Sequence, residues 1–196
     1  MTEWDNLDEY LKLVSLIAYE VESIKRANFQ YKNFIDSAKE NIDIMNISPS
    51  FFSEVISSFE YKVIVGFLKI FDHSGSASLP KLLNQCEQQK KKNSTLHKFI
   101  LNAKQQLELI NSFVEKLRPT RDMMLAHLDK KAFKEEGEEV PPIERSDLDK
   151  IDKWLDTAYN MLCKIFELEN EDPPPQMPLI DDFPKLVSNI RSKQEK

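Results

Sequence analysis

The distribution of glycine and proline constrains the fold of this chain more than any other feature. Average usage would give about fourteen glycines in a chain of this length, but the 196 residues include three, Gly66, Gly75 and Gly137. A glycine-rich phosphate loop, a G-x-G-x-x-G turn and Asn-Gly or Asp-Gly hairpin turns are therefore absent. The ten prolines are grouped and divide the chain into long stretches free of both residue types. Such stretches are typical of helices.

Apolar residues recur at spacings of three and four along most of these stretches, which indicates amphipathic helices. We predict an all-α fold, a bundle of four to five helices with a short motif-bearing helix after Pro119 and a Pro-rich C-terminal tail. The predicted helices cover residues 4 to about 27, 48–71, 79–88, 95–118, 121–128 and 146–170, and the periodicity leaves open whether the first continues through Phe29, Phe34 and Ile35. Residues 1–170 would form a single helical-bundle domain, and residues 171–196 a Pro-rich, charged tail.

Local signals define the ends of several predicted helices. Ser48-Pro49 provides an N-cap hydroxyl and a first-turn proline, and Ser94 or Thr95 would cap the helix that follows the short 79–88 segment. The helix over 48–71 is apolar around so much of its circumference that we expect it at the centre of the bundle. Pro119 disfavours helical geometry at the residue before it, so we expect the chain to break or kink there and a new helix to begin.

The net charge and the cysteine content limit which kinds of protein this chain can be and which cellular compartment it suits. The net charge of −6 argues against a protein that coats nucleic acid with its whole surface, although a local basic patch remains compatible with it. The two cysteines, Cys86 and Cys163, form no C-x-x-C motif, so we expect reduced thiols. The acidic start is unlike a signal peptide, and the most apolar run, residues 63–68, is too short to cross a bilayer. We therefore expect a cytoplasmic protein that does not bind membranes.

No metal site or nucleophile motif is present. Neither a His-x-x-x-His nor a calcium-loop spacing occurs, so we predict no metal and no cofactor. Among the three histidines, His73 is placed to cap a helix C-terminus and His97 to lie on the surface of a first turn. His127 differs because Arg121 precedes it by six positions on the segment after Pro119. About 0.2 such pairs are expected by chance, so the spacing alone is weak.

The residues around Arg121 and His127 add evidence that this pair is a functional motif. Arg121-Asp122-Met123-Met124-Leu125-Ala126-His127-Leu128-Asp129-Lys130 resembles the Arg-polar-…-Ala-His-x-Asp-Lys run of the abortive-infection U-like branch of the HEPN superfamily (higher eukaryotes and prokaryotes nucleotide-binding). Lys69-Ile70-Phe71-Asp72 and Ser78-Leu79-Pro80-Lys81-Leu82-Leu83 also resemble that branch, in the same order. The resemblance covers roughly residues 48–130.

The resemblance implies a helical bundle, and in many members a metal-independent endoribonuclease of prokaryotic defence or toxin systems. It implies a homodimer with a composite active site. Arg121 and His127 would be the catalytic pair, with Asp122 orienting them, although this carboxylate also cancels some of the charge that would hold a phosphate. Members whose tyrosine follows the histidine by two positions are modified by a nucleotidyltransferase; Asp129 occupies that place here.

Elementary chemistry agrees with these roles. Cleavage of RNA without a metal needs a group that takes the 2′-OH proton, an acid for the leaving 5′-oxygen and positive charge at the phosphorane, and would yield a 2′,3′-cyclic phosphate. Histidine suits proton transfer and arginine suits the charge. Residues 115–134 hold six basic and three acidic residues. We therefore predict that Arg118, Lys130 and Lys131 bind the RNA backbone.

Six positions on an ideal helix place two side chains about 120° apart in direction and about 9 Å apart along the axis. Arg121 and His127 would therefore not converge easily on one phosphate. Two arrangements would solve this: Arg121 in a first turn, where free N–H groups favour an anion, or two copies paired about a twofold axis.

Two other readings of the sequence remain open. The chain could be a catalytically inactive HEPN-fold protein that binds RNA or a nucleotide, or regulates a partner such as an antitoxin or a neighbouring defence protein. It could also be a helical scaffold that resembles the family by accident, with His127 facing solvent.

Overall fold

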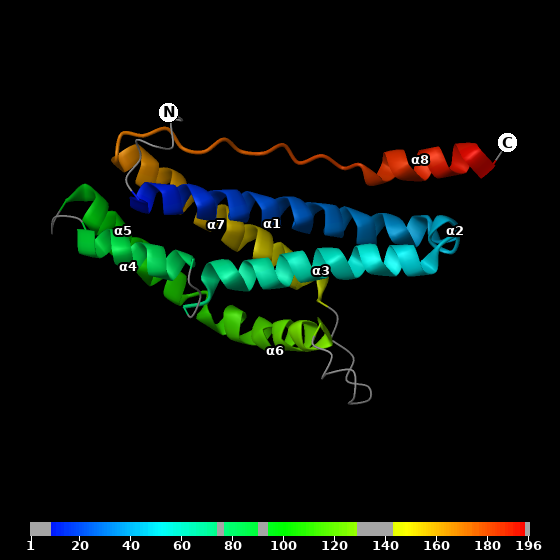
Figure 1. Cartoon of the computed structure of the whole chain (residues 1–196), viewed down its shortest axis with the longest axis horizontal. Coiled ribbons are helices and arrows are strands. Elements are labelled where there is room, and N and C mark those ends of the chain that lie inside the picture. The colour runs from blue at the N-terminus through cyan, green and yellow to red at the C-terminus, as the bar shows by residue number, and fades with distance from the viewer. Residues whose placement is uncertain (1–8, 74–76, 90–93, 129–142, 195–196) are drawn as a thin grey trace.

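The computed structural model of the chain describes residues 9–73, 77–89, 94–128 and 143–194, and within these ranges it contains helices and no strand (Figure 1). The prediction of an all-α fold is thus confirmed. The helices are α1 (Glu9–Glu40), α2 (Ile42–Met45), α3 (Pro49–Phe71), α4 (Leu79–Gln89), α5 (Thr95–Glu108), α6 (Asn111–Leu128), α7 (Arg145–Leu168) and α8 (Phe183–Gln194).

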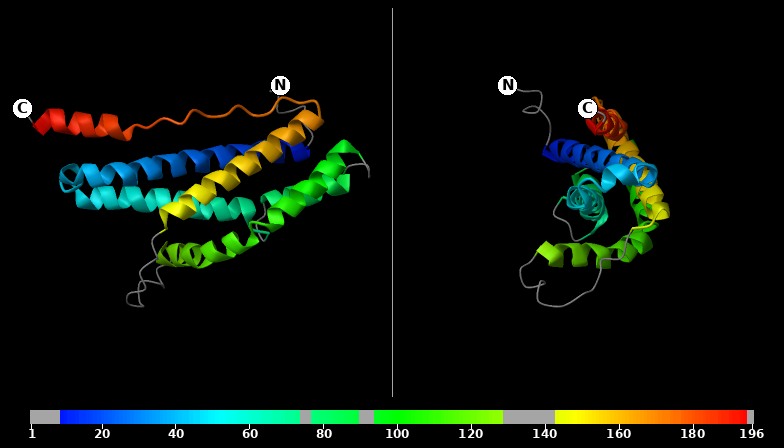
Figure 2. Two further views of the ribbon diagram at one scale, coloured as in Figure 1. Left: turned by 180° about the vertical axis from the view of Figure 1, so that it is seen from behind. Right: turned by 90° about the vertical axis from the view of Figure 1, so that its right-hand side faces the viewer.

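Helices α1 and α3 form an antiparallel hairpin that α2 closes (Figure 1). α7 crosses this hairpin obliquely when the molecule is seen from behind (Figure 2), and α4 packs against α5. The predicted stripe of the first helix is buried wherever it is described, for example at Val14, Ala18 and Val21. The helix continues to Glu40, well past the predicted end near residue 27, because Tyr31 and Phe34 extend the buried stripe.

The prediction that the helix over 48–71 is central holds for its second half. Val63, Ile64, Phe67 and Phe71 are buried in the main core, whereas Phe51 near the start of α3 is exposed. Ser48 is the N-cap with Pro49 in the first turn, as predicted, although the serine side chain makes no capping hydrogen bond. Ser94 caps α5 by accepting a hydrogen bond of 3.1 Å from the backbone N–H of His97.

The predicted break at Pro119 is wrong. α6 runs continuously from Asn111 to Leu128 with Pro119 inside it, so no short helix begins after the proline. Proline removes the hydrogen bond to the carbonyl four residues earlier, here that of Glu115. Both Pro119 and Glu115 are exposed, so water can take the place of the lost donor.

The break comes earlier instead, at Leu109 and Ile110, where the chain makes a tight turn between α5 and α6. Backbone N–H groups reach carbonyls three residues back, as from Ile110 to Leu107 at 3.2 Å. The predicted apolar stripe nevertheless continues across this turn. Of its members, Phe99 is partly buried and the others are buried, namely Leu96, Ile100, Ala103, Leu107, Ile110, Val114 and Leu117.

The Pro-rich segment after α7 is extended at first and then forms a helix, which was not predicted from the sequence. Residues 171–182 run alongside α1 back towards α2, and α8 follows (Figure 1). Phe183 and Val187 of α8 are buried in a small second cluster with Phe34, Ile44, Met45 and Phe52. The rings of Phe34 and Phe183 lie 4.7 Å apart. The last helix of the bundle, α7, begins one residue before the predicted Ser146, with Glu144 as its N-cap.

Candidate active site

The predicted site lies on α6, next to the end of α3. Arg118, Arg121 and Asp122 lie in the middle of α6, and α6 packs against α3. Arg121 is partly buried, with 24% of its side chain exposed, whereas the side chain of Asp122 is 62% exposed. The sequence singled out six site residues, and the structure describes the side chains of these three. They form one connected group.

Asp72, the C-cap residue of α3, joins this group and is its most buried member. Only 4% of its side chain is exposed. Its Oδ2 accepts from Nη1 of Arg121 at 3.1 Å, and its Oδ1 accepts from Nη2 of Arg118 at 3.0 Å. One carboxylate therefore holds two guanidinium groups from consecutive turns of α6.

Asp122 adds a second carboxylate to Arg121. Its Oδ1 accepts from Nε of Arg121 at 2.9 Å and lies 2.8 Å from Nη2. Partial burial acts to lower the pKa of Arg121, but hydrogen bonds to Asp122 and Asp72 and attraction to both carboxylates outweigh it and raise the pKa. Arg121 is therefore a fixed positive charge, held at two of its edges.

Arg118 repeats the same pattern one turn earlier. Besides Asp72, it contacts Glu115, whose Oε1 lies 2.9 Å from Nη1. Its Nε is buried and has no hydrogen-bond partner among the described residues. Two guanidiniums thus share three carboxylates, of which Asp72 is buried and the other two are exposed.

Contacts to α7 fix the first half of α6. Nζ of Lys116 lies 2.6 Å from Oδ2 of Asp147, a buried carboxylate near the start of α7. The hydrogen bond to Asp147 raises the pKa of Lys116. Nζ of Lys150 lies 5.6 Å from the centre of the Phe113 ring, a cation–π contact. These contacts orient α6 and with it the two arginines.

His127 lies in the last turn of α6, and its side chain is outside the described part of the structure. Lys130 and Lys131 also lie outside the described residues. Because α6 is continuous from Arg121 to His127, their backbone positions on an ideal helix differ by about 120° around the axis and about 9 Å along it. Arg121 is not in a first turn, so free helical N–H groups do not surround it.

The other histidines lie on different elements. His73 is exposed directly after Asp72, beyond the end of α3. His97, which we expected on the surface, is half-buried in the first turn of α5, and its Nδ1 is buried without a hydrogen-bond partner among the described residues. Neither belongs to the group around Asp72.

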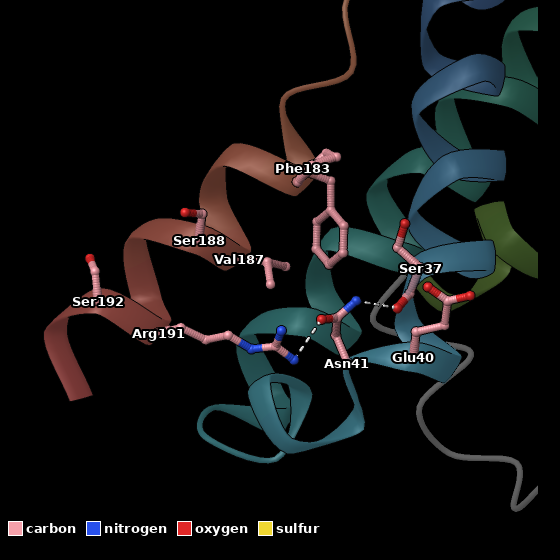
Figure 3. Close-up of a pocket in the computed structure, with 9 residues that line it drawn as sticks. Ser37, Glu40, Asn41, Phe183, Val187, Ser188, Arg191 and Ser192 are labelled. Atoms are coloured by element: carbon pink, nitrogen blue, oxygen red, sulfur yellow. Dashed lines mark hydrogen bonds between the residues drawn. The ribbon is translucent and has the colours of Figure 1, made fainter. Parts of the chain in front are cut away.

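A cavity of about 530 Å³ lies between the end of α1 and α8. Figure 3 shows Arg191 reaching from α8 to Asn41, whose Oδ1 accepts from Nη2 at 2.9 Å. Asn41 in turn donates to the backbone carbonyl of Ser37 at 2.8 Å. None of the predicted site residues lines this cavity.

Asp72 is the residue of this site that sequence reasoning missed. It belongs to the Lys69-Ile70-Phe71-Asp72 segment, which carried part of the family resemblance, but nothing in the sequence paired it with Arg118 or Arg121. The available signal was an acidic residue directly after a strongly apolar helix. A helix C-terminus disfavours a carboxylate, so an aspartate there indicates a specific cationic partner.

A metal-binding cluster and a membrane-spanning helix are both absent from the described ranges. No group of three or more histidine, cysteine, aspartate or glutamate side chains there could hold a metal ion. None of the described helices is both long enough and apolar enough to cross a membrane.

Comparison with known proteins gave one match. The model of the family HEPN_AbiU2, described as AbiU2, matches residues 8–169. The match includes the Asp72 segment and the whole of α6, and it stops before the extended segment and α8. No curated protein and no solved structure matches the chain.

Proposed function

Because the chain belongs to the AbiU2 family of HEPN domains, we propose that it is a metal-independent endoribonuclease that works as a homodimer. In this proposal it acts in the cytoplasm as a toxin or phage-defence effector of the abortive-infection kind. The resemblance described above supplies the reaction class. The contacts of Arg118, Arg121 and Asp122 described above support the roles that these three residues would have in it.

The observation that carries this proposal is the anchoring of Arg121. A guanidinium that is to stabilise a developing phosphorane must be held in place before the substrate arrives. The buried carboxylate of Asp72 holds Arg121 in this way, on the same continuous helix that carries His127. Preorganised charge beside a group that titrates near neutrality is the combination that metal-independent RNA cleavage needs.

The proposed reaction is a transesterification. A base takes the proton of the 2′-OH, the 2′-oxygen attacks the adjacent phosphorus, and the bond to the 5′-oxygen breaks as an acid protonates it. The products are a 2′,3′-cyclic phosphate and a 5′-OH end, and no water is consumed. His127 would act as the base or the acid, Arg121 would stabilise the charge on the phosphorane, and Asp122 would orient the pair until RNA binds. Arg118, Lys130 and Lys131 would bind the RNA backbone.

The continuity of α6 supports the dimer. Of the two arrangements that could bring Arg121 and His127 to one phosphate, a first-turn arginine is excluded because ten residues of α6 precede Arg121. Pairing of two α6 helices about a twofold axis would instead place two Arg/His sets in one cleft. It would also bring a second His127, so that one histidine acts as base and the other as acid.

Incubation of RNA with the protein in EDTA tests the activity. We expect cleavage with 2′,3′-cyclic phosphate ends, and a loss of at least about a hundredfold in Arg121→Ala and in His127→Ala. Arg145→Ala and His97→Gln are matched controls, because Arg145 pairs with Asp36 and His97 lies on α5. Cleavage that persists at the wild-type rate in either site variant would refute the assignment.

Sedimentation equilibrium tests the dimer. We expect a two-chain species at micromolar concentration. A protein that stays monomeric at the highest soluble concentration would contradict the composite site.

A specific observation favours a second candidate, a catalytically inactive HEPN-fold protein that binds RNA or a nucleotide or regulates a partner. Both arginines are already neutralised by carboxylates in the described structure. This candidate predicts intact RNA after incubation, together with measurable affinity for RNA or for a cognate antitoxin or neighbouring defence protein. The EDTA assay separates the two candidates.

A further inference from the structure

The three carboxylates around Arg118 and Arg121 differ sharply in exposure. Asp72 contacts both guanidiniums and is 4% exposed. Glu115 contacts Arg118 and is 61% exposed, and Asp122 contacts Arg121 and is 62% exposed. Each arginine therefore has one buried and one exposed acidic partner.

The exposed contacts are the weak ones. A carboxylate that water can solvate loses little when it leaves an ion pair, and dissolved salt screens the pair further. Glu115 and Asp122 can each turn into water by rotating about side-chain bonds. Asp72 has no such freedom, because it is enclosed between α3 and α6 and separation from the arginines would leave a buried charge without its cations.

The charge of the cluster depends on these two side chains. With all three carboxylates in contact, two guanidiniums face three negative charges and the cluster is negative by one. When Glu115 and Asp122 turn away, the two guanidiniums and Asp72 are positive by one. The cluster therefore repels an anion while all three carboxylates are in contact with the arginines, and attracts one when Glu115 and Asp122 have turned away.

The geometry suits a single phosphate group. Arg118 and Arg121 bind the two oxygens of the same Asp72 carboxylate, at 3.0 and 3.1 Å, so one carboxylate holds both guanidiniums within hydrogen-bond distance. Each also donates to an exposed carboxylate, Arg118 through Nη1 and Arg121 through Nε, and a phosphodiester oxygen can accept from the same donors. Glu115 and Asp122 thus occupy the places that a phosphate would take.

We propose that Arg118 and Arg121 form one phosphodiester-binding site which Glu115 and Asp122 shield, and that RNA binds by displacing these two carboxylates while Asp72 stays in place as a positioning residue. The identity of the ligand as RNA rests on the proposed function. The shield itself follows from the contacts and exposures of the five side chains.

A 2′-O-methyl RNA oligomer is the probe, because it lacks the nucleophilic 2′-OH and cannot be cleaved by this chemistry. Its affinity is measured by fluorescence anisotropy with the full-length protein. We expect the double variant Glu115→Gln/Asp122→Asn to bind about three- to tenfold more tightly, since two competing exposed ion pairs are removed. Arg118→Ala and Arg121→Ala should each weaken binding.

The matched control is Asp156→Asn/Glu167→Gln. These carboxylates are 59% and 55% exposed and are paired with Lys25 and Lys164, so the net charge changes by the same amount at a distant place. We expect less than a twofold change in affinity. Asp72→Asn also removes a negative charge, yet it should weaken binding because the arginines lose their anchor. General electrostatic attraction would predict tighter binding in all three cases.

The inference is overturned if the Glu115/Asp122 variant binds no more tightly than the control variant, or if the wild-type protein has no affinity for the probe. These outcomes are distinct from a failure of the ribonuclease proposal. If binding responds as expected but ordinary RNA is left intact, the ribonuclease proposal is contradicted and the shielded binding site is supported. If ordinary RNA is cleaved but the Glu115/Asp122 variant binds the probe no more tightly, the ribonuclease proposal is supported and the shielding role of these carboxylates is contradicted.

Discussion

The ends of two helices, α3 and α1, each hold an arginine against acidic or amide partners, but in different ways. At the end of α3, Arg121 binds Asp72, which is 4% exposed, among the buried rings of the main core. At the end of α1, Arg191 of α8 binds Asn41 and lies 3.6 Å from Asp43, which is 62% exposed. A buried carboxylate fixes an arginine because neither partner can exchange the contact for water, whereas an exposed one allows this exchange.

The same contrast holds for the apolar contacts. Phe71 precedes Asp72, is enclosed in the main core and has the Phe67 ring 4.6 Å away. Phe183 packs on Phe34 in the small second cluster, at the end of an extended segment. We infer that the first end unfolds only with the whole bundle and that the second can detach locally.

The largest expected effect compares the two phenylalanines. Phe71→Ala should lower the free energy of unfolding by about 3–5 kcal/mol because it empties part of the core. Phe183→Ala should lower the free energy of unfolding by no more than the docking of α8 contributes, about 1–2 kcal/mol. The reason is that α8 can detach while the bundle stays folded. Urea unfolding measures both, and hydrogen exchange should show lost protection in α8 alone for Phe183→Ala. Equal losses would contradict local detachment.

The next effect compares the two aspartates. Asp72→Ala should lower the free energy of unfolding by about 1–3 kcal/mol, because two hydrogen bonds to charged groups are lost and two guanidiniums are left side by side. Asp43→Ala should change it by less than about 0.5 kcal/mol, as expected for an exposed position. Urea midpoints at low and high salt give both values. A similar loss in the two variants would show that burial of the carboxylate is not what distinguishes the two ends.

The smallest expected effect is a pH dependence of stability. It concerns the ion pair between Lys32 of α1 and Asp149 of α7, which belongs to neither of the two regions compared above. The hydrogen bond from Lys32 lowers the pKa of Asp149 below its ordinary value of 3.8. The unfolded chain therefore binds a proton more readily at this group, so its stabilising contribution is present above the ordinary pKa and is lost as the pH falls through the folded-state pKa. Between pH 5 and pH 3, the wild-type protein should lose slightly more stability than Asp149→Asn. Identical pH profiles by urea unfolding would contradict the shift.

The sequence predicted those features that depend on periodicity. Buried stripes such as Leu96 to Leu117 follow from spacings of three and four, and they were right even across a turn that the sequence did not reveal. The Arg121–His127 motif and its upstream segment were sufficient to identify the family, which the match over residues 8–169 confirms. The catalytic roles of these residues remain predictions.

The sequence failed where a local rule competes with packing. Pro119 is a helix breaker by its covalent structure, yet α6 continues through it because the face with the missing hydrogen bond is exposed to water. Leu109 and Ile110 are ordinary helix formers, yet the chain turns there. Phe183 and Val187 are too few to predict a docked helix, because their burial depends on an apolar surface formed by α1, α2 and α3.

The sequence by itself determined that this protein is a helical bundle, which faces of its helices are buried, and which motif it carries, because these depend on residues within one or two helical turns of one another. Only the tertiary structure decided that Asp72 meets Arg118 and Arg121. These residues are separated by 46 and 49 positions, and the ion pairs exist because the packing of α3 against α6 removes the carboxylate from water and leaves the arginines as its partners.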